Sequence, residues 1–220
     1  MANNGREIEV KLRIADLNAL RAQLRRLGAK AAPRIFERNI LYDTQASDLR
    51  ETGRLLRIRI KTPAPDRRTA TSAGRAKSSA HKAAESRGVL TYKAPVVPSL
   101  DVRFASRYKE REEIEIEFNP AENLETIFAA LGLRSTFRYE KFRTSYSLRR
   151  VPGLHLDLDE TPLGNYLELE GSTAAIDRAA VLLGFSPQDY ITATYWDLHV
   201  ADSRGRNVAP GDLVFKNRKK

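Results

Sequence analysis

The first strand predicted from the sequence alternates between charged and apolar residues. Residues 7–13 are Glu-Ile-Glu-Val-Lys-Leu-Arg. Because successive side chains of a strand point to opposite faces, the apolar residues share one face and the charged residues share the other. In a single strand, this pattern indicates a sheet edge whose charged face is solvated. The same alternation returns in four later segments, at 57–61, 111–117, 141–143 and 168–170. Ordered charge on one face of five strands favours a function for that face.

The pattern along the whole chain predicts about eight strands and four helices. Strands are expected at 7–14, 34–43, 54–62, 88–93, 108–118, 135–148, 154–159 and 166–170. Helices are expected at 17–27 after the cap Asp16, at 121–131 after Asn119-Pro120, at 173–183 with Thr173 as the cap, and from 186 to about 200. The segment 49–53 is predicted to be a turn.

Hairpin connections make these strands antiparallel, and eight antiparallel strands form a barrel that can enclose side chains or one small ligand. We therefore predict an α+β, mostly β fold, in which an eight-stranded antiparallel β-barrel is covered on the outside by helices. With the charged faces turned inward, the lumen becomes a polar tunnel. The apolar faces then point outward, which explains why helices interrupt an otherwise β chain.

The net charge of +10 is concentrated in two segments. Residues 63–87 contain no large apolar side chain, which predicts a flexible basic insertion in a hairpin. The segment 61–87 carries a net charge of +5 and the tail 216–220 carries +4. The insertion and the tail could bind RNA weakly through phosphate contacts. The rest of the chain is nearly neutral, so the folded core is not expected to bind nucleic acid.

Length and cysteine content set further limits. A chain of 220 residues fits one ordinary domain with additions. The absence of cysteine excludes disulfides and thiolate metal sites, and it suits a reducing compartment. No apolar run is long enough to span a bilayer, and the N-terminus lacks the core of a signal peptide. We therefore expect a cytoplasmic protein without a membrane partner.

The predicted lumen brings many charges together. Its basic side chains would be Lys11, Arg13, Arg57, Arg59, Lys93, Arg111, Lys141 and Arg143, and its acidic ones Glu7, Glu9, Glu113, Glu115, Asp159, Glu168 and Glu170. A water-poor cavity holds such a set only if the charges pair with one another or with a ligand. Lysine and arginine suit a chain of phosphates, and paired carboxylates suit Mg²⁺ or Mn²⁺. A metal that bridges phosphate oxygens serves phosphoryl or nucleotidyl transfer. The alternative is a barrel of internal salt bridges without a ligand.

These motifs resemble those of the CYTH family, the triphosphate tunnel metalloenzymes. The segment 7–11 is similar to the ExExK signature at the start of that family's domain. The resemblance runs from about residue 6 to about residue 171 and includes, in order, Arg57-x-Arg59, Thr91-Tyr92-Lys93, Arg111-Glu-Glu-Ile-Glu115, Lys141-x-Arg143 and the segment 163–170. It implies a triphosphate tunnel domain at 1–184, followed by a C-terminal helix and basic tail at 185–220. The insertion and the segment after residue 184 depart from the compact family pattern.

The resemblance also implies roles for the lumen residues. The triphosphate-binding group is Lys11, Arg57, Arg59, Lys93, Lys141 and Arg143, to which the predicted lumen adds Arg111. The ligands of Mg²⁺ or Mn²⁺ are Glu7, Glu9, Glu168 and Glu170. The catalytic group is Glu7, Glu9, Lys11, Asp159, Glu168 and Glu170. Asp159 is preferred to Asp157 on the same face, and Glu113 and Glu115 could orient the arginines. The histidines 81, 155 and 199 match no functional position, and Tyr92 and Trp196 are interpreted as packing residues.

The family includes phosphohydrolases of inorganic triphosphate, thiamine triphosphate and nucleoside triphosphates, and also class IV adenylate cyclases. One tunnel serves both reactions, because the nucleophile, water or a ribose hydroxyl, decides the product. The layout of the motifs resembles the bacterial cyclase-type branch, yet no residues for a purine pocket are evident. We therefore expect a metal-dependent triphosphate hydrolase, with an adenylate cyclase and a non-catalytic triphosphate-binding module as alternatives. The choice of substrate, the choice between Mg²⁺ and Mn²⁺, and homodimer formation stay open.

Overall fold

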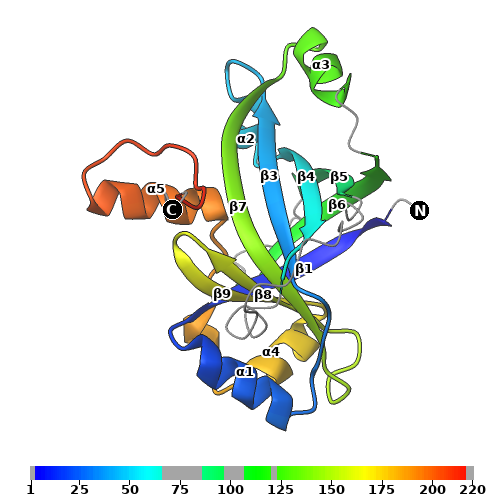
Figure 1. The fold of residues 1–220 in the computed structure, drawn as a ribbon, viewed down its shortest axis with the longest axis vertical. Helices are drawn as coiled ribbons and strands as arrows, with labels where there is room; N and C mark the ends of the chain where they lie inside the picture. Colours follow the sequence, from blue (N-terminus) through cyan, green and yellow to red (C-terminus); the bar gives the residue numbers. More distant parts are fainter. Residues whose placement is uncertain (1–2, 66–85, 97–106, 120–122, 217–220) are drawn as a thin grey trace, which may run out of the picture.

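A computed structural model describes residues 3–65, 86–96, 107–119 and 123–216 (Figure 1). Most of the predicted flexible insertion at 63–87 lies outside the described residues. The predicted start of the helix at 121 and the end of the basic tail lie outside them as well. No helix among the described residues combines the length and the apolar character needed to cross a membrane.

Eight antiparallel strands of the described part close into a barrel. They are β1 (Asn3–Ile14), β3 (Ile35–Asp43), β4 (Leu55–Pro63), β5 (Arg87–Pro95), β6 (Lys109–Phe118), β7 (Arg134–Ser147), β8 (His155–Thr161) and β9 (Gly164–Glu170). The order around the barrel is β7-β3-β4-β5-β6-β1-β9-β8, and β8 pairs with β7 to close it. The predicted barrel is therefore confirmed. A further strand, β2 (Lys30–Ala31), pairs with β7 outside the barrel and is too short to show an alternating pattern.

The largest hydrophobic core lies outside the barrel. Helices α1 (Leu17–Arg26) and α4 (Thr173–Leu182) lie together at one end, where they cover the outer faces of β1, β8 and β9 (Figure 1). This core includes the buried side chains of Val10, Leu12, Leu24, Leu167 and Ile176. Each buried side chain of this size contributes roughly 1.5–3 kcal/mol. The outward apolar residues of β1 thus find the predicted helical cover, which directs the alternate charged residues into the lumen.

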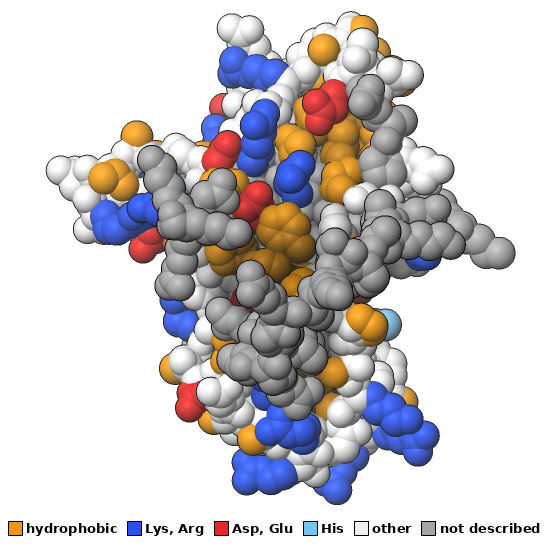
Figure 2. Space-filling model, in the orientation of Figure 1, with side chains coloured by type: hydrophobic (Ala, Val, Ile, Leu, Met, Phe, Trp, Pro, Cys, Tyr) orange, Lys and Arg blue, Asp and Glu red, His pale blue; other side chains and the backbone are white. Residues whose placement is uncertain are grey.

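The outer surface of this end is basic. Figure 2 shows lysine and arginine side chains gathered over the end of the molecule where α1 lies. Arg25 and Arg26 occupy the last turn of α1, where positive charge interacts favourably with the helix dipole. At the other end of α1, the carboxylate of Asp16 accepts hydrogen bonds from the backbone N–H groups of Asn18 and Ala19. The predicted cap of this helix is confirmed.

Two more helices pack elsewhere on the barrel. Helix α3 (Asn123–Ala130) lies at the end opposite to α1 and α4 (Figure 1), and its Phe128 ring lies 4.9 Å from the ring of Tyr42 on β3. Helix α5 (Tyr195–Gly205) packs through Tyr195 against Tyr139 of β7 and Tyr166 of β9. The C-terminal segment therefore takes part in the aromatic packing of the barrel.

The helix predicted from 186 to about 200 is wrong as a single element. A 3₁₀ turn (Pro187–Asp189) is followed by extended backbone, and α5 begins only after its cap Thr194. Ile191 exchanges two backbone hydrogen bonds of 2.9 Å with Lys11. This is possible because the pairing of β6 with β1 ends at Glu9, which leaves this edge of Lys11 open. Tertiary strand pairing thus interrupts the predicted helix.

Two local predictions also need correction. The predicted turn at 49–53 contains a short helix, α2 (Asp48–Glu51). The backbone N–H groups of Leu49 and Arg50 in this helix donate hydrogen bonds to the buried carboxylate of Asp43. The N-cap of α4 is Ser172 rather than Thr173, because the Ser172 hydroxyl accepts the hydrogen bond from the N–H of Ala175.

Candidate active site

The barrel encloses a cavity of about 330 Å³ that is lined by charged side chains. Its lining includes Glu7, Glu9, Lys11, Arg57, Arg59, Lys93, Arg111, Glu113, Glu115, Lys141, Arg143, Asp157, Glu168 and Glu170. These side chains come from β1, β4, β5, β6, β7, β8 and β9. The structure therefore brings together all residues of the predicted lumen except Asp159, which lies within the wall, and Arg13.

Arg13 is predicted to point into the lumen, and this prediction is wrong. Its side chain is exposed, and its guanidinium carbon lies 5.1 Å from the ring centroid of Tyr166, the residue opposite it on β9. The rings of Tyr166 and Tyr195 pack edge to face at 5.6 Å. Because these buried rings fill the interior at this level, Arg13 lies beyond the charged cavity.

Positive and negative charges are partly separated around the barrel. The neighbouring strands β7, β3, β4 and β5 supply the cations of one half, including Arg57, Arg59, Lys93, Lys141 and Arg143. The other half, β6, β1, β9 and β8, supplies seven of the eight carboxylates that line the cavity. The acidic half also supplies three cations, Lys11, Lys109 and Arg111. The nine lysines and arginines of the lining nearly balance its eight carboxylates, so net charge alone does not select an anion. The separation creates a cationic wall and an acidic wall within one cavity.

On the acidic side, carboxylates are paired with lysines. Glu7 accepts a hydrogen bond of 2.5 Å from Nζ of Lys93. Glu9 accepts hydrogen bonds from Nζ of Lys109 at 2.6 Å and of Lys11 at 3.0 Å. Burial lowers the pKa of Lys11, but the neighbouring carboxylates, chiefly Glu9, outweigh it and raise that pKa. The contact with Glu9 thus favours the charged form of the Lys11 ammonium.

The cationic wall is held from behind by Asp159. This carboxylate is fully buried and accepts hydrogen bonds from Lys141 Nζ at 2.7 Å, from Arg143 Nε at 2.7 Å and from the Tyr195 hydroxyl at 2.8 Å. Asp157, two residues earlier on β8, lines the cavity and lies 2.7 Å from Arg143. The two aspartates predicted to share a face are thus both at the site, and Asp159 is the one that positions two cations.

The side-chain carboxyl group of Glu170 forms no hydrogen bond or ion pair with any residue in the described part of the chain. Burial, followed by the nearby carboxylate of Glu7, raises the pKa of Glu170 to about 7. A buried carboxyl group in such acidic surroundings is stabilised by a proton or by a cation.

The predicted metal ligands fit a hard divalent cation in their chemistry. Glu7, Glu9, Glu168 and Glu170 offer carboxylate oxygens, which Mg²⁺ and Mn²⁺ prefer. In the arrangement seen here, no three acidic or histidine side chains among the described residues surround a common metal position. The reason is visible in the contacts, since Glu7, Glu9 and Glu168 each face a lysine or an arginine. Metal binding at these residues therefore requires an exchange of ionic partners.

Glu37 of β3 is a site residue that the sequence analysis missed. It is fully buried, lines the cavity, and lies 3.5 Å from Arg59 Nε and 3.6 Å from Lys141 Nζ. Neither of its oxygens accepts a hydrogen bond from the described residues. Burial raises the pKa of Glu37, but the surrounding cations, chiefly Arg59 and Lys141, outweigh it and hold that pKa well below its usual range. Phe36 and Arg38, on either side of Glu37, point outward. The alternation along this strand could therefore have predicted that Glu37 points inward.

Other missed residues orient the arginines or complete the wall. Asn39 accepts a hydrogen bond of 3.1 Å from Arg59, and the Tyr139 hydroxyl accepts one of 3.1 Å from Arg57. Tyr139 lies on the same face of β7 as the predicted residues Lys141 and Arg143, so its inward position could have been predicted from the sequence. Tyr195 reaches the cavity from α5. No local sequence pattern predicts such a long-range contact.

A closed β-barrel with cations and carboxylates separated inside it defines a β-tunnel protein with a charged interior. Residues 5–183 match the family model of the CYTH domain, and the chain belongs to this family.

Relatives and solved structures agree with this assignment. A protein of Methanocaldococcus jannaschii named "Putative adenylate cyclase MJ0240" is 28% identical over 172 residues, which are 78% of this chain and 80% of that protein. A "putative adenylate cyclase" structure from Vibrio parahaemolyticus has a TM-score of 0.64 at 15% identity and covers 89% of this chain and 98% of its own. The PH1819 protein of Pyrococcus horikoshii has a TM-score of 0.64 at 22% identity, with coverages of 89% and 99%. At these identities, the solved structures show a shared fold.

Proposed function

We propose that this protein is a divalent-metal-dependent enzyme that binds a triphosphate in the barrel lumen and hydrolyses a phosphoanhydride bond. The substrates considered are inorganic triphosphate, thiamine triphosphate and nucleoside triphosphates. The observation that carries the proposal is the cationic wall, in which Arg57, Arg59, Lys93, Lys141 and Arg143 line one cavity. The absence of cysteine also supports a cytoplasmic location as part of this proposal.

The arginines suit a chain of phosphates in both position and chemistry. A guanidinium donates two parallel hydrogen bonds to phosphate oxygens, whereas an ammonium acts as a compact charge. Arg57 is buried, and its two Nη atoms donate to Tyr139 and Thr91, while its Nε has no partner among the described residues. This unused donor supports a role for Arg57 in binding an anion.

The acidic wall supports the metal part of the proposal. Glu7, Glu9, Glu168 and Glu170 would hold Mg²⁺ or Mn²⁺, which, when bound, neutralises charge that develops on phosphate oxygens and helps to orient the nucleophile. The lysines that now neutralise Glu7 and Glu9, chiefly Lys93, would then be available to the triphosphate. The charge separation across the lumen supports such an exchange, because metal and phosphate would each find a wall of opposite sign.

Cyclisation of ATP to cyclic AMP and pyrophosphate is the second candidate function. It is favoured by the name of the Methanocaldococcus jannaschii relative, which is 28% identical to this chain and is named a putative adenylate cyclase. A structure named "Putative adenylyl cyclase HpAC1", from Hippeastrum, is described as having a dominant triphosphatase activity and has a TM-score of 0.51 at 21% identity, covering 90% of this chain and 96% of its own. Both activities are thus named on this fold. Hydrolysis is placed first because it requires no exclusion of water from the attacking position.

The deciding experiment supplies tripolyphosphate, thiamine triphosphate or ATP with Mg²⁺ or Mn²⁺ and measures released phosphate and cyclic AMP in parallel. Phosphate release that stops on chelation supports the hydrolase. Cyclic AMP as the main product from ATP replaces it with the cyclase. Tight binding of a triphosphate without either product leaves a non-catalytic triphosphate-binding module.

A further inference from the structure

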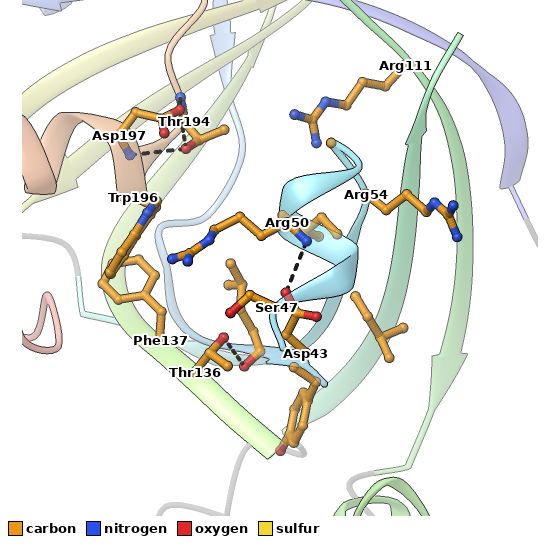
Figure 3. A pocket seen from close by; sticks show the side chains of 15 residues that line it. Asp43, Ser47, Arg50, Arg54, Arg111, Thr136, Phe137, Thr194, Trp196 and Asp197 are labelled. Carbon is orange, nitrogen blue, oxygen red and sulfur yellow. Dashed lines mark hydrogen bonds between the residues drawn. The ribbon is translucent and has the colours of Figure 1, made fainter. Parts of the chain in front are cut away.

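A second pocket, of about 160 Å³, adjoins the charged cavity. Leu55, Arg111 and Thr194 line both spaces, so the pocket and the cavity share part of their walls. The pocket also has an aromatic wall made by Phe137 and Trp196 (Figure 3). Because the pocket lies beside the proposed triphosphate site, it is a candidate binding site for the part of a larger substrate that carries no phosphate.

The inner faces of the barrel strands run from the cavity into this pocket. Along β7, Lys141 and Tyr139 line the cavity, and Phe137, next on the same face, lines the pocket. Along β4, Arg57 lines the cavity and Leu55 reaches both spaces. The interior therefore changes along one continuous surface from a charged cavity to a pocket in which apolar and aromatic side chains lie beside charged ones.

Trp196 offers a ring surface in the pocket. Its side chain is half-buried and packs edge to face on Phe137, with ring centroids 4.9 Å apart. The guanidinium carbon of Arg50 lies 5.6 Å from the Trp196 ring, and Figure 3 shows Arg50 extending across the pocket toward it. Trp196 was expected to be a packing residue, and in the structure it also lines a pocket. A planar group could stack between the Trp196 ring and the Arg50 guanidinium once the two move apart, because a ring between them needs about 7 Å, two contacts of about 3.5 Å.

The polar groups of the pocket favour a neutral or electron-rich ligand. The side chains of Arg50, Arg54 and Arg111 line it and have no acceptor among the described residues. The two carboxylates of the lining are already engaged. Asp43 accepts three backbone hydrogen bonds at the start of α2, and Asp197 accepts two from its helix cap, Thr194. A cationic ring would therefore meet three guanidinium groups without a free carboxylate.

We propose that this pocket binds the neutral heteroaromatic ring of a nucleoside triphosphate, with a purine as the best match, while the triphosphate occupies the charged cavity. The inference rests on the proposed function and selects among its substrates. A purine offers ring acceptors to arginine and a flat face for stacking. Sites for whole ligands measure about 300–1,000 Å³, so the smaller pocket suits one ring system of a longer molecule. The thiazolium of thiamine triphosphate is positively charged and is disfavoured by the same arginines.

Trp196 is the only tryptophan in the chain, so its fluorescence reports directly on the pocket. A non-hydrolysable ATP analogue should change the emission on binding. Tripolyphosphate should compete with the analogue but should not produce the same change by itself. An analogue that binds and is displaced by tripolyphosphate without changing the emission would overturn the inference. This measurement does not depend on catalysis, so it tests the pocket even if the wild-type protein hydrolyses nothing and the proposed function fails.

Kinetics of Trp196→Ala and Arg50→Ala give the second test. Loss of ring stacking should raise KM for ATP by about tenfold, in line with the roughly 1–3 kcal/mol of one stacked base. Activity on tripolyphosphate should stay within about twofold, because neither side chain lines the charged cavity. Arg204→Ala, in the exposed last turn of α5, is the matched control and should change neither substrate. Equal losses on ATP and tripolyphosphate, or a preference for thiamine triphosphate that depends on Trp196, would contradict the proposal.

Discussion

Lys93 donates a hydrogen bond of 2.5 Å to Glu7, so a proposed phosphate-binding cation neutralises a proposed metal-binding carboxylate. Lys93 comes from β5 and Glu7 from β1, with β6 between them in the barrel. Breaking a buried pair by removing one partner leaves an uncompensated charge, which typically costs about 3–5 kcal/mol. A metal and a triphosphate that arrive together would replace both partners at once. This pair therefore has the matched charges that the proposed exchange with a metal and a triphosphate requires.

The acidic wall is tested by Glu9→Gln. We expect kcat/KM for tripolyphosphate to fall by about 100-fold or more, since even groups that only support a metal ligand are worth about 10–100-fold. The substitution keeps the shape of the side chain and removes its charge. The measurement is steady-state phosphate release over a range of Mn²⁺ concentrations.

Glu112→Gln provides the control, because Glu112 is exposed on the outer face of β6. It should retain wild-type activity and metal dependence. Equal losses in the two variants would show that Glu9 has no special role.

The cationic wall is tested by Arg57→Ala. Hydrogen bonds to charged groups contribute about 1.5–3 kcal/mol, so KM for tripolyphosphate should rise by about 10–100-fold. The dependence of KM on salt should weaken as well, because one ionic contact is lost. Arg38→Ala, at an exposed position of β3, is the matched control. An unchanged KM in a folded Arg57→Ala protein would remove Arg57 from the binding site.

The positioning role of Asp159 predicts a change in binding beyond a loss of stability. In Asp159→Asn, Lys141 and Arg143 lose their shared carboxylate, and KM for tripolyphosphate should rise by about tenfold or more. Tyr195→Phe removes only one of the donors to Asp159 and should cost about 1.5–3 kcal/mol of stability with a smaller change in KM. Both values come from kinetics and urea unfolding on the same preparations. Lower stability of Asp159→Asn with an unchanged KM would reduce Asp159 to a structural residue.

Much of this site followed from alternation along the strands. The inward charges of β1, β4 and β9 were predicted because each strand is long enough for a period of two to be clear. Arg13 was misplaced because alternation gives the face of a residue but not the level at which Tyr166 closes the interior. Tyr195 and Ile191 could not be placed, since their contacts with Asp159 and Lys11 depend on how the C-terminal segment packs.

Glu37 predicts a specific pH dependence of stability. Its pKa is held below the unfolded value of about 4.3, so the ionised group stabilises the folded protein above that pH and this contribution is lost as the pH falls. The stability difference between wild type and Glu37→Gln should therefore shrink below pH 4, by up to about 1.4 kcal/mol per pH unit. Urea unfolding between about pH 2 and about pH 7 covers the onset of this loss below the unfolded pKa and measures the difference, with Glu112→Gln as the control. Parallel curves for wild type and Glu37→Gln would contradict the assignment.

The most direct test of the central claim is phosphate release from tripolyphosphate by the wild-type protein, measured with Mn²⁺ or Mg²⁺ and again after chelation. A metal-dependent hydrolase should release phosphate only when the metal is present, stop releasing it with EDTA, and resume when excess metal is restored. Release that continues unchanged in EDTA, or no release from a folded protein that binds tripolyphosphate in the presence of either metal, would contradict it.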